Sequence, residues 1–257
     1  MKKRTTALQV ISALFLAAAA FGQQAPTLAP PRAGFTFPQK QTLTYTVDWR
    51  VFPAGTAVIH FEAIEDNKEK ITASAETSGA INLLFHVSDH FQSTIDRAKA
   101  CTYQFDKQTV EGRRQVNSTL KIDYTAMKSF WDEKNLVTGA NRHMETPIAG
   151  FLTDLLSGMY YASSQNLVVG QSFVIPVADA LHTVPVTMKV EGREEVKTPL
   201  GTFKTIRVQP TADAGVVKNR GNIWIWYTDD DRHLPVQMRA RLFWGTITFR
   251  LSANDQK

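Results

Sequence analysis

Alternation of apolar and polar residues with a period of two constrains the fold of this chain more than any other feature of its sequence. From Leu43 to Val51 every second residue is apolar and the residues between them are polar. Because successive side chains of a β-strand point to opposite faces, this pattern predicts a strand with one face against a core. A turn is predicted at Pro53–Gly55, after which the alternation resumes. Similar stretches cover residues 57–63, 116–124, 184–190, 234–242 and 247–251. The chain is therefore expected to form mainly β-structure.

One stretch departs from the β pattern and predicts an amphipathic helix. Its large apolar residues recur at i, i+3, i+4, i+7, i+8 and i+11, the spacing of one helix face: Ile148, Phe151, Leu152, Leu155, Leu156 and Met159. Thr146 is placed to cap this helix, and Pro147 suits its first position. The only long helix of the mature chain is therefore expected over residues 148–162. A large antiparallel sheet exposes a broad apolar face, which such a helix can cover. The expected fold is mainly β, a large curved antiparallel sheet that is half-barrel-like, with one amphipathic helix packed on its concave face.

The first 22 residues have the pattern of a signal peptide. Three basic residues (Lys2, Lys3 and Arg4) precede an apolar run from Val10 to Phe21, and small residues at Ala20 and Gly22 favour cleavage after Gly22. The alternative is a membrane anchor, but the run is short for a hydrocarbon core about 30 Å thick. We expect an exported protein, periplasmic or extracellular, that is not an integral membrane protein.

The rest of the chain is expected to hold one domain. Residues 23–37 are Pro-rich and without apolar periodicity, which is typical of a disordered linker. A single β-rich domain is expected over residues 38–252, followed by a C-terminal tail at residues 253–257. Cys101 is the only cysteine, so no intramolecular disulfide can form. The net charge of +5 falls to +2 without residues 1–22, which carry three basic residues and no acidic ones. This weak charge gives no reason to expect a nucleic-acid partner.

The order of short motifs along the chain resembles a known family. An apolar strand with Trp224 and Trp226 leads into an Asp-rich turn at residues 229–231 and then into Leu234-Pro235-Val236. A hairpin turn at Thr198–Gly201 precedes them, and Leu43-Thr44-Tyr45 followed by Ala54-Gly55 opens the domain. These motifs resemble the bacterial exported family catalogued as domain of unknown function 3108, over about residues 38–252. The resemblance implies export and an all-β fold with a helix, similar to the half-barrel periplasmic lipoprotein carriers. It implies no activity and no catalytic residues.

The sequence contains no recognisable catalytic or metal-binding constellation. There is no Gly-x-Ser-x-Gly motif and no phosphate-binding glycine loop. His86, Asp89 and His90 lie close together in sequence but without a full ligand set, and the Asp run 229–231 is more typical of a turn than of a calcium loop. We therefore expect no cofactor, no metal site and no catalytic residues, and an enzyme is the less favoured interpretation.

Bulky apolar residues suggest a hydrophobic cleft between sheet and helix, although filling the core is the default role of such side chains. The ligand-lining candidates are Trp49, Phe61, Phe151, Leu155, Met159, Trp224 and Trp226. Three functions remain open. The chain can be a non-catalytic envelope protein that binds a hydrophobic small molecule or lipid, a structural or protein-binding envelope factor with a filled core, or a hydrolase whose carboxylates converge only on folding.

Overall fold

A single antiparallel sheet makes up most of the protein. The computed structural model describes residues 27–179, 182–219, 221–243 and 245–256, so the predicted signal peptide lies outside the described residues. Fourteen strands follow one another along the chain: β1 (Lys40–Trp49), β2 (Phe52–Ile64), β3 (Lys68–Thr77), β4 (Val87–Asp96), β5 (Thr102–Glu111), β6 (Arg114–Asp123), β7 (Lys128–Asn135), β8 (Asn141–Pro147), β9 (Ser172–Asp179), β10 (His182–Thr198), β11 (Gly201–Thr211), β12 (Asn222–Thr228), β13 (Pro235–Leu242) and β14 (Gly245–Gln256). The helices are α1 (Gly79–Leu84), α2 (Leu155–Ser163) and α3 (Gly215–Asn219).

The strands are joined almost entirely as neighbouring hairpins. Their spatial order is β8-β7-β6-β5-β4-β3-β2-β1-β14-β13-β12-β11-β10-β9, so the first and last strands pair in the middle of the sheet. The two edges, β8 and β9, are consecutive in sequence and are joined by the segment that contains α2. Helix α2 therefore lies in the connection between the two edges of an open sheet.

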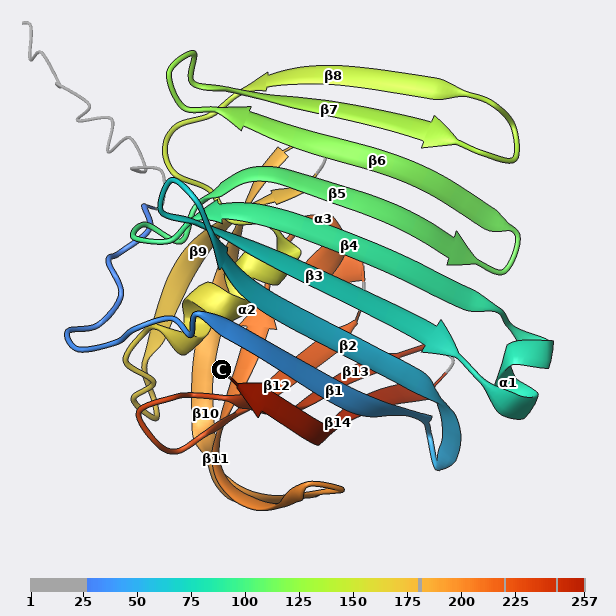
Figure 1. The fold of residues 1–257 in the computed structure, drawn as a ribbon, viewed down its shortest axis with the longest axis vertical. Helices are drawn as coiled ribbons and strands as arrows, with labels where there is room; N and C mark the ends of the chain where they lie inside the picture. The colour runs from blue at the N-terminus through green and yellow to red at the C-terminus, as the bar shows by residue number, and fades with distance from the viewer. Residues whose placement is uncertain (1–26, 180–181, 220, 244, 257) are drawn as a thin grey trace, which may run out of the picture.

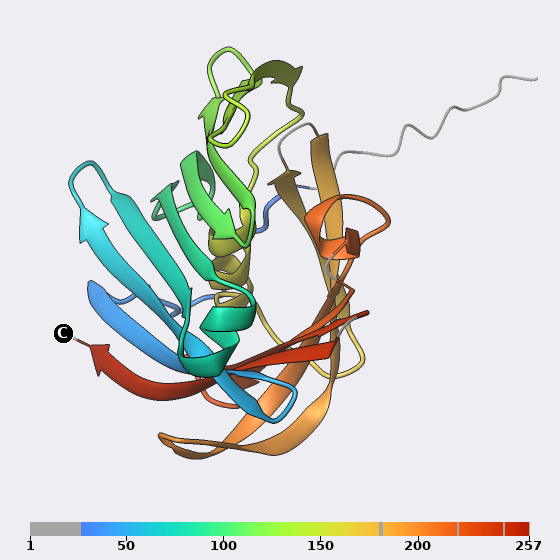
Figure 2. The same cartoon turned by 90° about the vertical axis from the view of Figure 1, so that its right-hand side faces the viewer.

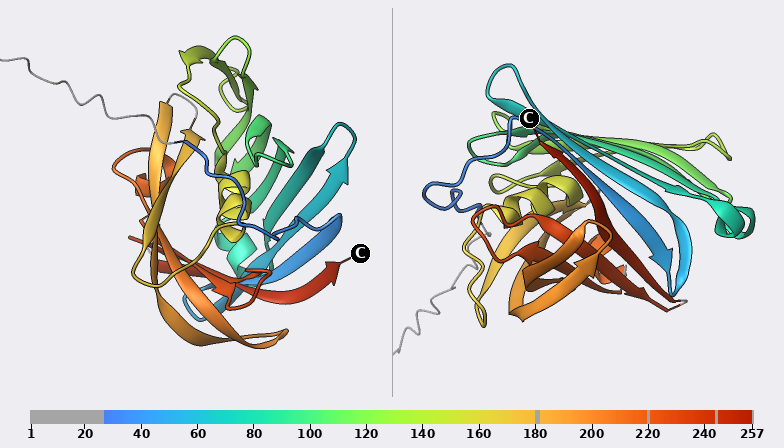
Figure 3. Two further views of the ribbon diagram at one scale, coloured as in Figure 1. Left: turned by 90° about the vertical axis from the view of Figure 1, so that its left-hand side faces the viewer. Right: turned by 60° about the horizontal axis from the view of Figure 1, so that its bottom comes forward.

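The sheet curves around α2, which packs on its concave face (Figures 1 and 2). Figure 3 shows α2 inside the curve from two other directions. The inner face of the sheet carries the core, to which Leu43, Ile71 and Leu251 contribute completely buried side chains. This architecture confirms the expected curved, half-barrel-like antiparallel sheet with an amphipathic helix on its concave face.

The long helix begins later than the sequence pattern predicts. It spans Leu155–Ser163, whereas Thr146 and Pro147, the expected cap and first helical residue, belong to β8. Thr153 instead takes an extended conformation and forms a parallel bridge to Val177 of β9. The Thr153 amide donates to the Pro176 carbonyl at 2.9 Å, and the Ala178 amide donates to the Thr153 carbonyl at 2.7 Å. Pairing of the backbone with β9 thus excludes helix before residue 154.

Asp154 takes the capping role that the sequence pattern assigned to Thr146. Its Oδ1 accepts hydrogen bonds from the amides of Leu156 (2.8 Å) and Ser157 (3.1 Å). The Ser157 hydroxyl accepts from the Asp154 amide at 2.8 Å, which completes a capping box. This local signal outweighs the apolar stripe upstream, because the free amides of a first helical turn need acceptors.

The segment before β1 is bound to the end of α2. Arg32 Nη1 donates to the carbonyls of Ser163 (2.7 Å) and Gln165 (3.2 Å), and the Tyr161 hydroxyl donates to the Ala29 carbonyl at 3.0 Å. A guanidinium at the carbonyl end of a helix interacts favourably with the helix dipole. Residues 27–37 therefore pack against the domain within the region predicted as linker. At the other terminus, β14 continues to Gln256, past the expected domain end at residue 252.

Candidate functional site

Phe61 lies in the core against α2, and Met159 is a partly buried residue of α2. The Phe61 ring stacks on Tyr160 of α2 with centroids 4.5 Å apart, and only 1% of its surface is exposed. The Met159 carbonyl accepts a 3.0 Å hydrogen bond from the Tyr227 hydroxyl of β12. These contacts fix α2 to both halves of the sheet. Phe61 therefore fills core in this structure, the default role that its sequence allowed.

Phe151 and Leu155 lie at the exposed start of α2. Their exposed fractions are 38% and 44%, whereas their neighbours Leu152 and Leu156 are buried. The Phe151 ring contacts Tyr124 edge to face, with centroids 5.1 Å apart. The late start of α2 explains this placement, because the residues before Asp154 do not continue the helical face.

Trp224 and Trp226 point away from α2. Tyr227 reaches α2 from the inner face of β12, and the adjacent Trp226 projects from the outer face. There the Trp226 Nε1 donates to Glu194 of β10 at 2.8 Å, and the Arg239 guanidinium lies 5.3 Å from the Trp226 ring centroid. The long β10–β11 hairpin curls over this outer face, with the Leu200 amide donating to the Leu251 carbonyl of β14 at 3.2 Å. Trp226 is buried beneath the hairpin and cannot line a cleft on the inner side.

Trp49 lies on the inner face but at the end of β1 far from α2. It pairs with Phe52 of β2 and with Ile247 of β14, at the turn ends of these strands. Phe61, by contrast, pairs with Gln41 at the opposite end of β1. The structure therefore places Phe61 and Met159 at α2, in contacts with opposite halves of the sheet, and leaves the other five candidates in three separate places.

The inner face has a half-buried apolar region that sequence reasoning did not select. Val47, Phe249 and Met238 are register partners on β1, β14 and β13, and all three side chains are partly exposed beyond the end of α2. Ala73 and Phe91 form a second such pair on β3 and β4. We call these five residues the inner apolar face. The period-two pattern places Val47 and Phe249 on the core side, but only the position of α2 leaves them partly exposed.

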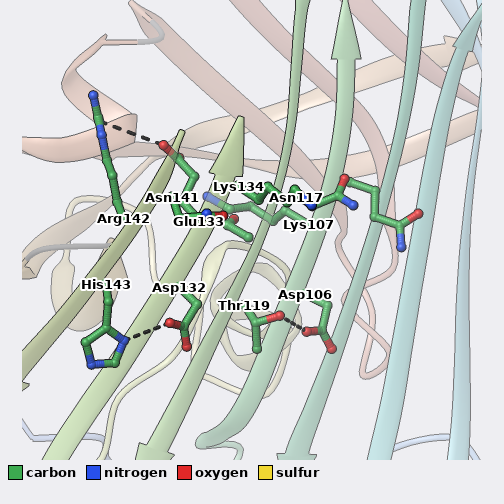
Figure 4. A pocket seen from close by; sticks show the side chains of 12 residues that line it. Asp106, Lys107, Asn117, Thr119, Asp132, Glu133, Lys134, Asn141, Arg142 and His143 are labelled. Carbon is green, nitrogen blue, oxygen red and sulfur yellow. Dashed lines mark hydrogen bonds and ion pairs between the residues drawn. The ribbon is translucent and has the colours of Figure 1, made fainter. Parts of the chain in front are cut away.

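A polar trough runs across the outer face of β5–β8 (Figure 4). It has a volume of about 560 Å³, and a second hollow of about 500 Å³ continues it over β2–β5, with Asp106 and Gln108 lining both. One row of register partners crosses its floor: Asp106, Thr119, Asp132 and His143.

The polar groups of this trough are largely bonded to one another. His143 Nδ1 lies 2.7 Å from Asp132 Oδ1, and the Thr119 hydroxyl donates to Asp106 at 2.7 Å. Such groups can hydrogen-bond a polar ligand. Each new bond would replace one that already exists to a neighbour or to water, so its net contribution is small.

The strongest pKa shift of a carboxyl group belongs to Glu69, which is completely buried on β3. Burial raises the pKa of Glu69 to about 7, opposed by the Arg97 guanidinium 3.5 Å away. The Tyr160 hydroxyl donates to Glu69 at 3.3 Å. A carboxyl enclosed by these side chains in the core has no open space for a substrate, so its shift does not identify an active site.

Other chemistry-bearing groups are engaged in packing. Burial raises the pKa of Cys101 to about 11, so its thiol stays protonated at neutral pH and is a poor nucleophile. Desolvation and the Arg32 charge lower the pKa of His233. Within the described part of the chain, no three His, Cys, Asp or Glu side chains are grouped as metal ligands. None of the described helices is long and apolar enough to cross a bilayer.

Comparison with known proteins identifies the family. The model of the family described as "Protein of unknown function (DUF3108)" matches residues 44–252. The chain belongs to this family. The resemblance drawn from the motifs of β12 and β13 is thereby confirmed. No curated protein matches the chain.

The solved structures that are similar to this DUF3108 chain include the following two. A β-barrel-like protein of domain of unknown function DUF1849 from Brucella abortus is 10% identical, with 87% of this chain and 100% of that chain covered and a TM-score of 0.59. A candidate lipoprotein from Parabacteroides distasonis is 11% identical, with 85% and 97% covered and a TM-score of 0.31. At such identities the first likeness is one of fold alone.

Proposed function

We propose that this protein is an exported, non-catalytic cell-envelope protein that binds a hydrophobic or lipid-like ligand on the inner apolar face. The observation that carries the proposal is the row Val47, Phe249 and Met238, apolar side chains on the concave side of the sheet that α2 leaves partly exposed. Phe91 and Ala73 form a second, partly exposed apolar pair on the concave side of β3 and β4. Export is supported by the sequence of residues 1–22.

The energetics favour the inner face over the polar trough as a binding surface. Removing apolar surface from water contributes roughly 25 cal/mol per Å², and each buried CH₂ about 0.8 kcal/mol. An acyl chain of a dozen methylenes can therefore offset the several kcal/mol of freedom that a ligand loses on binding. A flexible apolar chain also tolerates a curved surface that is not closed on all sides.

A fluorescent fatty-acid probe tests the proposal with a matched pair of variants on β3. Ala73 packs against the core on the inner face, and the adjacent Thr72 side chain points to the opposite, outer face of β3. Ala73→Glu places a carboxylate among the apolar side chains that would meet the ligand, so the probe should bind at least tenfold more weakly, equivalent to about 1.4 kcal/mol. Thr72→Glu should leave the affinity within about twofold of the wild type.

Leu155→Glu is a second control. Because Leu155 is 44% exposed at the start of α2, a carboxylate there should not weaken probe binding. If the folded wild-type protein binds neither the probe nor any lipid that co-purifies with it, the ligand-binding proposal is wrong. The filled-core interpretation, a structural or protein-binding envelope factor, then takes its place.

A further inference from the structure

Large apolar side chains are exposed together at one end of the molecule. Val51 in the β1–β2 turn is 82% exposed, Leu83 and Leu84 in α1 are 88% and 77% exposed, and Phe243 in the β13–β14 turn is fully exposed. Soluble proteins seldom expose such a group of side chains without a function. We call the following six residues the apolar tip: Val51, Phe52, Leu83, Leu84, Phe85 and Phe243.

The backbone holds these turns next to one another. Trp49 pairs with both Phe52 and Ile247, which places the β1–β2 and β13–β14 turns side by side. The Ser78 amide, just before α1, donates to the Ala54 carbonyl of β2 at 2.8 Å. Figure 1 shows α1 and the β1–β2 turn on the right-hand side of the sheet, away from α2. The apolar tip is therefore one feature of the fold and not a set of scattered side chains.

Packing in the core does not explain the apolar residues of helix α1. None of its six residues, Gly79–Leu84, is buried, and Phe85 directly after it is 51% exposed. The opposite end of the sheet differs, because the β2–β3 turn carries the exposed polar residues Glu65, Asp66 and Asn67. The apolar residues near that end are less exposed, with Ile64 and Met127 at 39% and Leu155 at 44%.

Three arginines lie near the apolar tip. Arg50 lies in the β1–β2 turn, Arg241 near the end of β13, and Arg113 in the β5–β6 turn, and all three are exposed. The β5–β6 turn is tied to the region after α1 by the Gly112 amide, which donates to the His86 carbonyl at 2.7 Å. Two acidic side chains lie nearby: Glu111 is 3.4 Å from Arg114, and Glu76 is 4.0 Å from the His90 imidazole, which is charged only when protonated.

We propose that the apolar tip is a docking surface for an anionic lipid membrane, with its apolar side chains entering the headgroup region and the arginines meeting lipid phosphates. Surfaces that lie in the membrane interface typically combine apolar and aromatic side chains with neighbouring basic ones. The positive charge of the three arginines complements the negative charge of an anionic leaflet. The proposal goes beyond ligand binding on the inner apolar face and does not depend on it.

Docking at the apolar tip would bring the near end of the inner apolar face close to the bilayer. Val47 and Phe249 are separated by one residue from Trp49 and Ile247, the pair that borders the apolar tip. A hydrophobic ligand held on the inner face would then have a short path between the protein and the lipid phase.

Co-sedimentation of the purified, exported protein with lipid vesicles tests the proposal. We expect the wild type to sediment with vesicles of phosphatidylethanolamine and phosphatidylglycerol, and at least tenfold less with phosphatidylcholine alone. Leu83→Ser with Leu84→Ser, and separately Phe243→Ser, should lower partitioning onto the anionic vesicles at least tenfold. Arg113→Glu should weaken it in low salt and have less effect in high salt.

Ile64→Ser, at the opposite end of the sheet, is the matched control and should sediment like the wild type. The tip variants should keep the wild-type melting temperature and bind the fatty-acid probe normally, since their side chains are exposed and lie outside the inner apolar face. A wild type that stays in solution with anionic vesicles overturns the proposal. So does a dimer or a complex with another protein that buries the apolar tip and is lost in the same variants.

Discussion

The Ser93 hydroxyl donates a 2.5 Å hydrogen bond to Asp154 Oδ2, and both side chains are completely buried. Thr102 donates to the same oxygen at 2.7 Å. The inner face of β4 and the start of β5 thus hold the residue that caps α2. One carboxylate satisfies donors from the sheet and from the first helical turn.

Asp154→Ala should destabilise the protein strongly. The change removes the cap and leaves buried donors of Ser93, Thr102 and two amides without their acceptor, so we expect a loss of about 2–4 kcal/mol in the free energy of unfolding. Urea denaturation measures it. Asp123 accepts from two turn amides at 2.8 Å each, but it is exposed. Asp123→Ala should therefore cost less than about 1 kcal/mol. Equal losses in the two variants would show that the buried network is not the source of the effect.

Glu69 should make stability depend on pH in an unusual direction. Its pKa is about 7 in the folded protein and near 4.5 when exposed, so the folded state binds more protons between these values. Stability conferred by this group is then complete below about pH 4.5 and falls as the pH rises toward 7. Glu69→Gln should remove this decline in a comparison of melting temperatures at pH 5 and pH 8.

The exposed Glu65 provides the control for that measurement. Glu65→Gln makes the same chemical change at an exposed position in the adjacent turn. This variant should therefore retain the decline in melting temperature between pH 5 and pH 8. If Glu69→Gln instead steepens the decline, the Glu69–Arg97 ion pair outweighs burial and the direction of the pKa shift is wrong.

Gly201 closes the β10–β11 hairpin in a conformation that only glycine adopts easily. Its φ is +149°, and Thr198 pairs with Gly201 across the two-residue turn that the sequence predicts. A Cβ at Gly201 or at Gly150 would meet no atom within 4 Å, so the two positions differ only in backbone conformation. Gly201→Val should therefore cost roughly 1–3 kcal/mol by thermal unfolding, and Gly150→Val much less. Similar melting temperatures for the two variants would contradict the backbone argument.

Sequence patterns were enough to predict the strands with clear alternation, such as β1, β6 and β14, together with the β10–β11 turn, the existence of an amphipathic helix and the family. Period-two alternation is a local property of the chain, so Leu43, Tyr45 and Val47 could be assigned to one face without any tertiary information. The turn at Thr198–Gly201 is likewise specified by the residues within it.

Which apolar residues contact one another depends on the tertiary structure and could not be predicted from local patterns. In β12 both faces are apolar, and alternation cannot tell that Tyr227 faces α2 while Trp226 lies under the β10–β11 hairpin. The start of α2 depends on Thr153 pairing with Val177, a contact between distant parts of the chain that outcompetes the helical pattern. Whether Val47 is covered or partly exposed depends on how far a nine-residue helix reaches along a curved fourteen-stranded sheet. Sequence periodicity specifies the side of each strand, whereas sheet curvature and the position of the helix specify what that side contacts.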